Sequence, residues 1–419
     1  MPDFDSFDRS VPVVLMRLDR NPFHHGTLGA ARSLGRAGVP VHAVVESPAS
    51  PVVSSRYVRR CHVRPDGDDL TSLRAVLLAV SAELGGAPAV LLPMDDVGAL
   101  ALDALRPGLT GRYLLPGQPP GLTARVADKE RLAALCRELD VPHPRTLVPS
   151  GAEEAAAMAR ELGLPVVAKW SRPWLLPAGS GLRSTLVART EREVRALYGQ
   201  RERAGSRLLL QERLPGGPGS DWFFHGYCDS AGGCGVAATG RKERSWPHGA
   251  GLTAVGTWQA NPAVERSARR LVGELGYRGV VDLDFRRDPA TGTYHLLDFN
   301  PRPGAQFRLF SDPRGLDVVR ALHLDLTGRP VPRLTGVPGR RLVVEQYAAL
   351  SLLTAPRPRR TAPGGAGVPV LPAGQGGTET AWYAADDPAP ALAMARAWGA
   401  HALRTARARL APRPRPSTP

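Results

Sequence analysis

Lysine is rare in this chain, and its positions are the first candidates for chemistry. Lysine and arginine together number 54 among the 419 residues, but only Lys129, Lys169 and Lys242 are lysines. Isoleucine is absent and asparagine occurs only three times, so a coding bias accounts for the general scarcity of lysine. Arginine can carry surface charge, but it cannot replace a compact ammonium that must fit against one phosphate oxygen. The three lysines are therefore candidates for phosphate contacts, with chance retention as the alternative.

Oxygen-bearing side chains near residue 300 are typical of a metal site. Residues two apart in a strand share a face, so Asp298 and Asn300 project to the same side of one expected strand. A hairpin with the preceding strand can bring Asp284 beside them, and such an oxygen-only set suits Mg²⁺. A solvent-facing acidic edge is the alternative, but the apolar neighbours and the nearby Arg302 weaken it.

Lys169 ends an apolar stretch and precedes a loop rich in Gly, Pro and Ser, residues 171–181. This arrangement can place an ammonium and free backbone N–H groups on a polyphosphate. A lysine whose stem packs along the strand while its charge reaches water is the alternative. The Walker A pattern GxxxxGK[ST] is absent, so a P-loop enzyme is excluded. Four charges at 241–244, Lys242 among them, indicate by themselves only a solvated strand end.

The elements that must position these residues begin with an alternation of strands and helices. Strands are expected at 11–16, 39–45 and 89–93, and helices at 27–37, 70–84 and 97–105. Residues 1–120 therefore predict a small doubly wound, Rossmann-like α/β domain. The dinucleotide fingerprint GxGxxG is missing, which argues against bound NAD.

The pattern changes after residue 121 to mixed α and β structure. Helices are expected at 128–139, 153–162, 191–203 and 262–275, and strands at 164–169, 184–189, 207–212, 280–287 and 293–300, with mostly β structure over 221–258. We expect this domain to span residues 121–328, in two subdomains of about 121–210 and 211–328. Residues 329–419 are rich in Pro and Gly and end in an arginine-rich tail that is expected to be disordered.

Composition narrows the class of protein. Hydrophobic content of 43% and charged content of 22% are those of an ordinary globular protein, and no apolar run is long enough to span a membrane. The acidic N-terminus has no signal-peptide pattern, and the four cysteines have no metal-finger spacing. These features predict a cytoplasmic protein with free thiols. The net charge of +15 could indicate nucleic acid, but six arginines without an acid lie between Pro388 and Pro419, and nucleotide phosphates are a sufficient anionic partner.

The order of short motifs resembles the ATP-grasp carboxylate–amine ligases over about residues 12–317. The motifs are DK at 128–129, VPHP at 141–144, PVVAK at 165–169, LQERLP at 210–215, GRKER at 240–244, GYRGVVDLDF at 276–285 and LDFNPR at 297–302. The resemblance implies an ATP-grasp fold behind an N-terminal Rossmann-like domain. It also implies an enzyme that activates a carboxylate with ATP as an acyl phosphate and joins it to an amine.

The resemblance further implies a role for each matching residue. Lys129 and Lys169 would contact ATP, and the loop with Ser180 and Gly181 would close over the triphosphate. Adenine would lie against Gln211, Glu212 and Leu214, and one or two Mg²⁺ ions, with Mn²⁺ as an alternative, would be held by Asp284, Asp298 and Asn300. Arg302 and Lys242 would act on the transferred phosphoryl group. The implied partners are a small carboxylate and an amine, such as an amino acid or peptide, without membrane or nucleic acid, and a homodimer is compatible.

The metal acids depart from the family pattern. The family usually has Glu where Asp298 stands and often Glu where Asp284 stands, and the shorter side chain matters because Mg²⁺ requires near-octahedral geometry at about 2.0–2.1 Å. A nucleotide-binding ATP-grasp protein with weakened catalysis is therefore an alternative to the ligase. A nucleic-acid-binding protein that uses the arginine-rich end is a further alternative.

Overall fold

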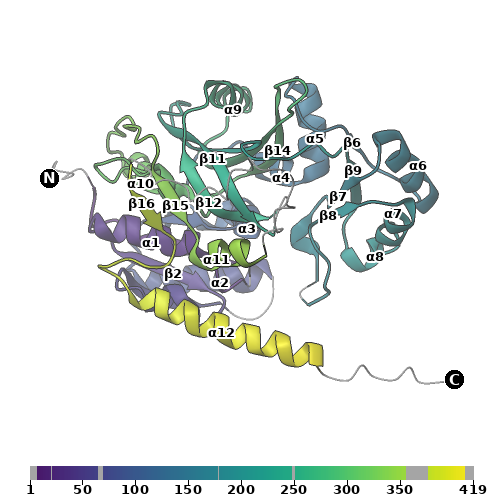
Figure 1. Cartoon of the computed structure of the whole chain (residues 1–419). Helices are drawn as coiled ribbons and strands as arrows, with labels where there is room; N and C mark the ends of the chain where they lie inside the picture. The colour runs from purple at the N-terminus through teal and green to yellow at the C-terminus, as the bar shows by residue number, and fades with distance from the viewer. Residues whose placement is uncertain are drawn as a thin grey trace, which may run out of the picture.

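The computed structural model describes residues 7–19, 21–64, 69–177, 179–247, 251–354 and 376–410, with side chains to residue 404. Its core is three sheets, one in each successive part of the chain (Figure 1). The part of the expected tail beyond residue 410 lies outside the described residues.

The first sheet is parallel and has the strand order β3-β2-β1-β4-β5. Its strands are β1 (Val13–Met16), β2 (Val41–Val45), β3 (Val58–Val63), β4 (Ala89–Pro93) and β5 (Tyr113–Leu114), joined through α1 (His25–Arg36), α2 (Leu70–Glu83) and α3 (Asp96–Leu109). Three of these strands and all three helices lie where the sequence predicts them. The edge strand β3 is not predicted because its partly exposed polar residues hide the apolar alternation of a strand.

The second sheet is small and antiparallel, with the order β6-β9-β7-β8. It contains β6 (Thr146–Leu147), β7 (Val166–Trp170), β8 (Thr185–Ala188) and β9 (Leu208–Gln211), packed on α6 (Ala152–Leu162), α7 (Glu191–Tyr198) and α8 (Arg201–Ala204). The expected single helix 191–203 is two helices, with Gly199 and Gln200 between them. Two helices precede this sheet, α4 (Leu122–Ala127), which the sequence patterns do not predict, and α5 (Lys129–Glu138).

The third sheet is the largest and has the order β14-β13-β10-β11-β12-β15-β16. Its antiparallel part comprises β10 (Asp221–Cys228), β11 (Val236–Trp246), β12 (Leu252–Trp258), β13 (Gly279–Arg287), β14 (Tyr294–Asn300) and β15 (Arg341–Val343). On one face it packs against α4, α5 and α9 (Pro262–Glu274). Side chains of β10, β11 and β13 on its other face share a core with α10 (Val318–Leu326) and the N-terminal sheet.

The region after residue 328 is part of this framework. It contributes β15, α11 (Glu345–Leu353) and β16 (Thr378–Thr380), which pairs in parallel with β15. It ends in α12 (Ala389–Leu410), which runs along the N-terminal domain in Figure 1. The sequence patterns predict none of these elements. The disorder expected for residues 412–419 lies outside the described residues. Short strands that depend on pairing with a distant sheet have too little local pattern to be recognised.

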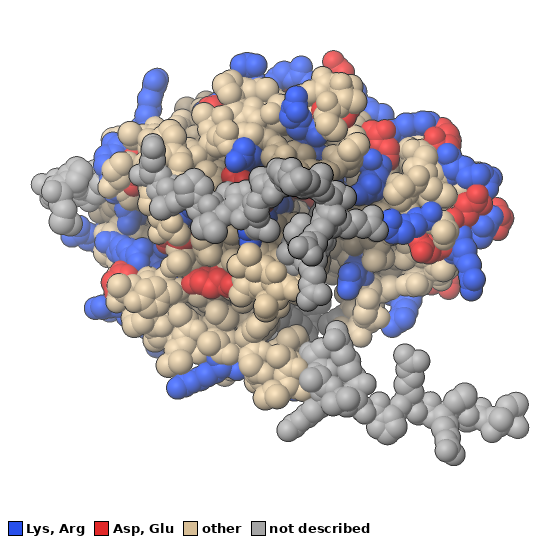
Figure 2. All heavy atoms as spheres, viewed as in Figure 1, with Lys and Arg blue, Asp and Glu red and all other residues tan. Residues whose placement is uncertain are grey.

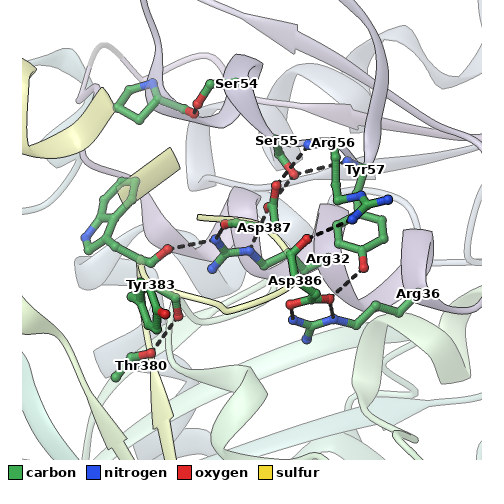
Figure 3. A network of polar contacts seen from close by, with 12 residues as sticks. Arg32, Arg36, Ser54, Ser55, Arg56, Tyr57, Thr380, Tyr383, Asp386 and Asp387 are labelled. Atoms are coloured by element: carbon green, nitrogen blue, oxygen red, sulfur yellow. Dashed lines mark hydrogen bonds and ion pairs between the residues drawn. The ribbon is translucent and has the colours of Figure 1, made fainter. Parts of the chain in front are cut away.

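A buried ion pair joins the C-terminal segment to α1 (Figure 3). Arg32 Nε donates to Asp387 Oδ2 over 2.9 Å, and both side chains are at most 1% exposed. Asp387 also accepts from the Ser55 hydroxyl and the Arg56 backbone N–H. Arg32 donates in addition to the carbonyl oxygens of Trp382 and Asp387. Every partner is tied to several others, so the strand β16 and the N-terminal domain are held in one arrangement.

A second pair next to it is more exposed. Arg36 binds Asp386 through two hydrogen bonds of 2.7 and 2.8 Å, and Asp386 also accepts from the Tyr57 hydroxyl. The side chains of Arg36 and Asp386 are 34% and 41% exposed. Because water screens this pair, its contribution to stability is small.

We therefore predict different stability effects for the two aspartates. Asp387→Ala leaves the Arg32 charge buried without its partner and should lower the free energy of unfolding by about 3–5 kcal/mol. The neighbouring Asp386→Ala is the matched control and should cost about 1 kcal/mol or less. Urea denaturation of both variants measures this. Equal losses would show that the buried pair does not hold the C-terminal segment.

Candidate active site

Two lysines from separate elements converge on one carboxylate. Lys129 is the first residue of α5, where Asp128 caps the helix by accepting from the N–H groups of Glu130 and Arg131. Lys169 lies on β7 of the small sheet. Their Nζ atoms are 2.7 and 3.5 Å from Asp298 Oδ1 on β14. The small sheet, α5 and the large sheet therefore meet at Asp298.

The charges around Asp298 shift the pKa values of Asp298, Lys129 and Lys169 in different directions. Burial alone would raise the pKa of Asp298, but the two lysines lower it to about 2. Burial lowers the pKa of Lys169, and the positive charge of Lys129 adds to this effect. Burial by itself would also lower the pKa of Lys129, but the negative charges of Asp298 and Asp96 outweigh burial and raise this pKa. The site thus holds two ammonium groups near one carboxylate, an excess of positive charge that suits a phosphate group.

The hairpin of β13 and β14 places the expected metal ligands in direct register. Asp284 lies opposite Asp298, and Asn300 lies opposite Asp282, the next residue on the same face of β13, so that Asn300 is a diagonal neighbour of Asp284. The amide of Asn300 donates to Asp282 Oδ2 over 3.3 Å. Burial raises the pKa of Asp284 to about 6, and Asp282 and Asp298 add to this shift, although Lys242 opposes it. The positive charge of Lys242 therefore offsets only part of the cost of burying the Asp284 carboxylate beside two other acids.

This donor set fits a hard divalent cation. Mg²⁺ is commonly held by one or two carboxylates together with waters and substrate phosphates. Asp284 and Asp298 offer two carboxylates from neighbouring strands, and the carbonyl oxygen of Asn300 is left free when its amide nitrogen donates to Asp282. In the part of the chain that the structure describes, no three His, Cys, Asp or Glu side chains are grouped as a complete metal site. A metal here would accordingly need ligands from the nucleotide.

Arg302 lies at the junction with the N-terminal domain. Its Nη1 is 3.1 Å from Asp282 Oδ2, and its Nε is 3.2 Å from Oδ1 of Asp96, the first residue of α3. Asp282 is also 3.2 Å from Nε2 of His225, which is fully buried on β10. Burial lowers the pKa of His225 to about 3, so this imidazole is neutral. Lys242 is on β11, and its Nζ is 3.8 Å from Asp284 Oδ1.

The residues expected at the nucleotide base lie apart from this cluster, on and after β9. The side chain of Gln211 is buried and donates to the Thr146 hydroxyl over 2.9 Å. Glu212 accepts from the backbone N–H of Arg145, and Leu214 is buried. In the loop after β7, Ser180 is partly exposed and Gly181 is exposed with φ +73°. The Ser180 carbonyl accepts from Arg203, which holds the loop against α8.

Three residues in this cluster are absent from the predicted set, namely Asp96, Asp282 and His225. Asp282 shares a face with Asp284, so the strand period alone could identify it. Asp96 follows a parallel strand, which is a common place for ligand-binding residues in open α/β sheets. His225 lies among apolar residues on β10, and nothing in that sequence distinguishes it from an ordinary core histidine.

Comparison with solved structures identifies the fold. An N5-carboxyaminoimidazole ribonucleotide synthetase in complex with ADP superimposes with a TM-score of 0.58 at 14% identity, over 78% of this chain and 80% of that one. A biotin carboxylase domain from Hydrogenobacter thermophilus, with MgADP and bicarbonate, gives a TM-score of 0.56 at 17% identity, over 77% and 72% of the two chains. These likenesses confirm the predicted ATP-grasp fold.

Sequence comparison agrees with this assignment. The chain is 26% identical over 234 residues to the arginine-specific carbamoyl phosphate synthase large chain of Geobacillus stearothermophilus, and 23% identical over 247 residues to a D-aspartate ligase of Enterococcus faecium. These matches cover 54% and 56% of this chain, but only 21% and 58% of the relatives. No family model matches the chain. In sequence as in fold, the chain is thus similar to ATP-grasp proteins, the class that its motifs predict.

We predict that Lys169 cannot be exchanged for arginine. Lys169→Arg keeps the charge, but a planar guanidinium cannot occupy the space of a buried ammonium that is 3.5 Å from Asp298 and 3.1 Å from the Leu297 carbonyl oxygen. ATP affinity or ATP turnover should fall at least tenfold, about 1.4 kcal/mol. The converse exchange on the exposed face of α7, Arg192→Lys, is the control and should change neither. Unchanged ATP binding and turnover in Lys169→Arg would contradict the assigned role.

A second prediction concerns Asp298. Asp298→Asn removes the carboxylate that pairs with two largely buried lysines, so the ligand-free protein should lose about 3 kcal/mol or more of stability. It should also lose Mg²⁺-dependent ATP binding, since one of the two carboxylates expected to hold the metal is gone. Asp298→Glu restores the charge and should recover both properties in part. Thermal denaturation and calorimetric titration with ATP, each with and without Mg²⁺, measure these effects.

Proposed function

We propose that the protein is an ATP-dependent carboxylate–amine ligase. The observation that carries this proposal is the convergence of Lys129, Lys169 and Asp298, with Asp284 opposite Asp298, at the junction of the two antiparallel sheets. Such a cluster can position a polyphosphate and neutralise its charge. Phosphoryl transfer requires this kind of positioning and charge stabilisation.

The nucleotide would lie between the small and the large sheet. We assign Lys129 and Lys169 to its phosphates, and Asp284, Asp298 and Asn300 to one or two Mg²⁺ ions, with Mn²⁺ as an alternative ion. Glu212 and Leu214 would contact the base, and the hydrogen bond from Gln211 to Thr146 would support that wall of the site. When bound, the metal would neutralise charge on the transferred phosphoryl group. Two of the structural neighbours were solved with ADP, one of them as the magnesium salt.

The reaction would proceed in two steps. A carboxylate oxygen attacks the γ-phosphorus of ATP, ADP leaves, and an acyl phosphate forms. An amine nitrogen then attacks the acyl carbon, phosphate leaves, and the nitrogen loses a proton as the amide bond forms. Arg302 and Lys242 lie on either side of the Asp282–Asp284 pair and would stabilise the transferred phosphoryl group.

Water must be kept from the acyl phosphate. The loop with Ser180 and Gly181, which follows β7, would cover the phosphates during the reaction. Within this scheme we propose domains at residues 1–120 and 121–328, with the segment from 329 completing the large sheet and bracing the N-terminal domain. One relative is named for D-aspartate, which favours an amino acid among the substrates. We propose a cytoplasmic location. Among the described residues, no helix has the length and apolarity needed to cross a membrane.

A nucleotide-binding protein without ligase activity is the second candidate. The observation that favours it is that Asp298 already pairs with two lysines, so that metal binding must compete with them. A nucleic-acid-binding role is not favoured. The arginine-rich end begins as α12, which packs against the 3-10 turn Pro51–Ser54, and basic and acidic side chains are interspersed on the face shown in Figure 2.

Phosphate release across a panel of amino acids, with and without amines, tests the proposal. We expect ADP and phosphate to form only when MgATP, a carboxylate and an amine are all present, with the amide detected by mass spectrometry. Arg302→Gln should lower kcat about 100-fold and leave the Kd for ATP nearly unchanged, because Arg302 acts on the transferred group and not on bound ATP. Tight ATP binding without turnover on any pair would favour the second candidate.

A further inference from the structure

We propose that a cavity between α3 and the start of β13 binds the zwitterionic end of an amino dicarboxylic acid, whose second carboxylate is the group that is activated. In this arrangement Asp103 binds the ammonium group and Arg106 binds the α-carboxylate. The inference rests on the proposed function, because it names the carboxylate substrate of the same site.

The cavity lies where the N-terminal domain meets the large sheet. Its volume is about 470 Å³, including the part open to solvent. One wall is α3, and the opposite wall is formed by residues 277–280 at the start of β13 and by Pro116 and Gln118. Arg302 lines one end. A ligand in this cavity can therefore reach the arginine assigned to the phosphoryl group.

One face of α3 leads from Arg302 into the cavity. Asp96, Ala99, Asp103 and Arg106 follow at spacings of three, four and three residues, which places them on the same side of a helix. Asp96 is 3.2 Å from Arg302, while Ala99, Asp103 and Arg106 line the cavity. Seven residues separate Asp96 from Asp103, which corresponds to about 10 Å along the helix axis.

Two of the four charged side chains that line this cavity, Asp103 and Arg106, have no partners in the described parts of the chain, whereas Arg278 donates to the Tyr277 carbonyl and Arg302 pairs with Asp96 and Asp282. Neither Asp103 nor Arg106 takes part in a side-chain hydrogen bond or a salt bridge there, and the Nε of Arg106 is buried without an acceptor. A buried donor without an acceptor is costly, so it marks a place that a ligand can fill. The remaining wall combines apolar side chains, such as Leu102, Val280 and Leu322, with polar ones, such as Gln118, Thr123 and Tyr277.

The charge pattern identifies the chemical class of this ligand. An α-amino acid carries an ammonium and a carboxylate on the same carbon, and adjacent turns of α3 present one acid and one arginine at neighbouring positions. Arginine binds a carboxylate through two parallel hydrogen bonds. Because Asp103 and Arg106 lie about two helical turns or more from Asp96, an amino acid bound to them would extend its side chain toward Arg302. The proposed function requires a carboxylate there, so the side chain carries the second carboxylate.

Binding measurements on the intact protein test this assignment. Calorimetry with aspartate and glutamate, each in both enantiomers, should show binding of at least one, and its N-acetyl derivative should bind at least tenfold more weakly. Arg106→Gln and Asp103→Asn should each lower the affinity for the amino acid at least tenfold, with the Kd for MgATP unchanged. The affinity of Arg106→Lys should lie between those of the wild type and Arg106→Gln. Arg112→Gln and Glu202→Gln change exposed residues and are the matched controls, so they should bind the amino acid as the wild type does. The melting temperatures of all variants should equal that of the wild type.

The outcomes separate this inference from the proposed function. If ADP forms with an amino acid but its KM is the same in the wild type, Arg106→Gln and Asp103→Asn, the site assignment is overturned while the ligase stands. If the amino acid binds and both variants weaken this binding, but no ADP forms with any amine, the site assignment stands and the proposed ligase function is overturned. Failure of all four amino acids to bind the wild type at millimolar concentration overturns the inference.

Discussion

The pairing of Asp298 with Lys129 and Lys169 is the interaction on which the site depends. It joins the first turn of α5, a strand of the small sheet and a strand of the large sheet at one carboxylate. Two ammonium groups that are largely buried would be unfavourable without this carboxylate, and the carboxylate would be unfavourable without them. The same charges that hold the three elements together belong to the site proposed for a polyphosphate and its metal, so in this proposal stability and ligand binding share the same residues.

The position of the N-terminal domain is set by contacts at both of its ends. Asp96 on α3 meets Arg302 beside the site, and Arg32 on α1 meets Asp387 at the far end of the chain. The segment that carries Asp387 begins at β16, the last strand of the large sheet. Glu379 on this strand is bound by Arg308 and Arg340, so the strand is itself anchored. The C-terminal segment therefore spans the large sheet and the N-terminal domain, and keeps Asp96 within reach of Arg302.

Much of the architecture could be predicted from local patterns. The alternation of apolar strands and amphipathic helices indicates the N-terminal domain, and the apolar face that Val264, Ala268, Leu271 and Val272 form predicts α9. The strand period places Asp298 and Asn300 on one face, and the register of β13 and β14 puts Asp284 opposite Asp298. The elements after residue 328 could not be predicted, because β15 and β16 have three residues each and depend on the sheet that they extend.

The sequence by itself determined the kinds of groups available, namely three lysines, an acid pair on neighbouring strands and an arginine just beyond them, in an order that resembles ATP-grasp ligases. The tertiary structure decided how they combine. It paired Asn300 with Asp282 and joined both lysines to one carboxylate. It also placed Asp96 against Arg302 and His225 against Asp282. The physical reason is that residue type and spacing fix which side of an element a group occupies, whereas its partner depends on how distant elements pack and on which charges burial then forces together.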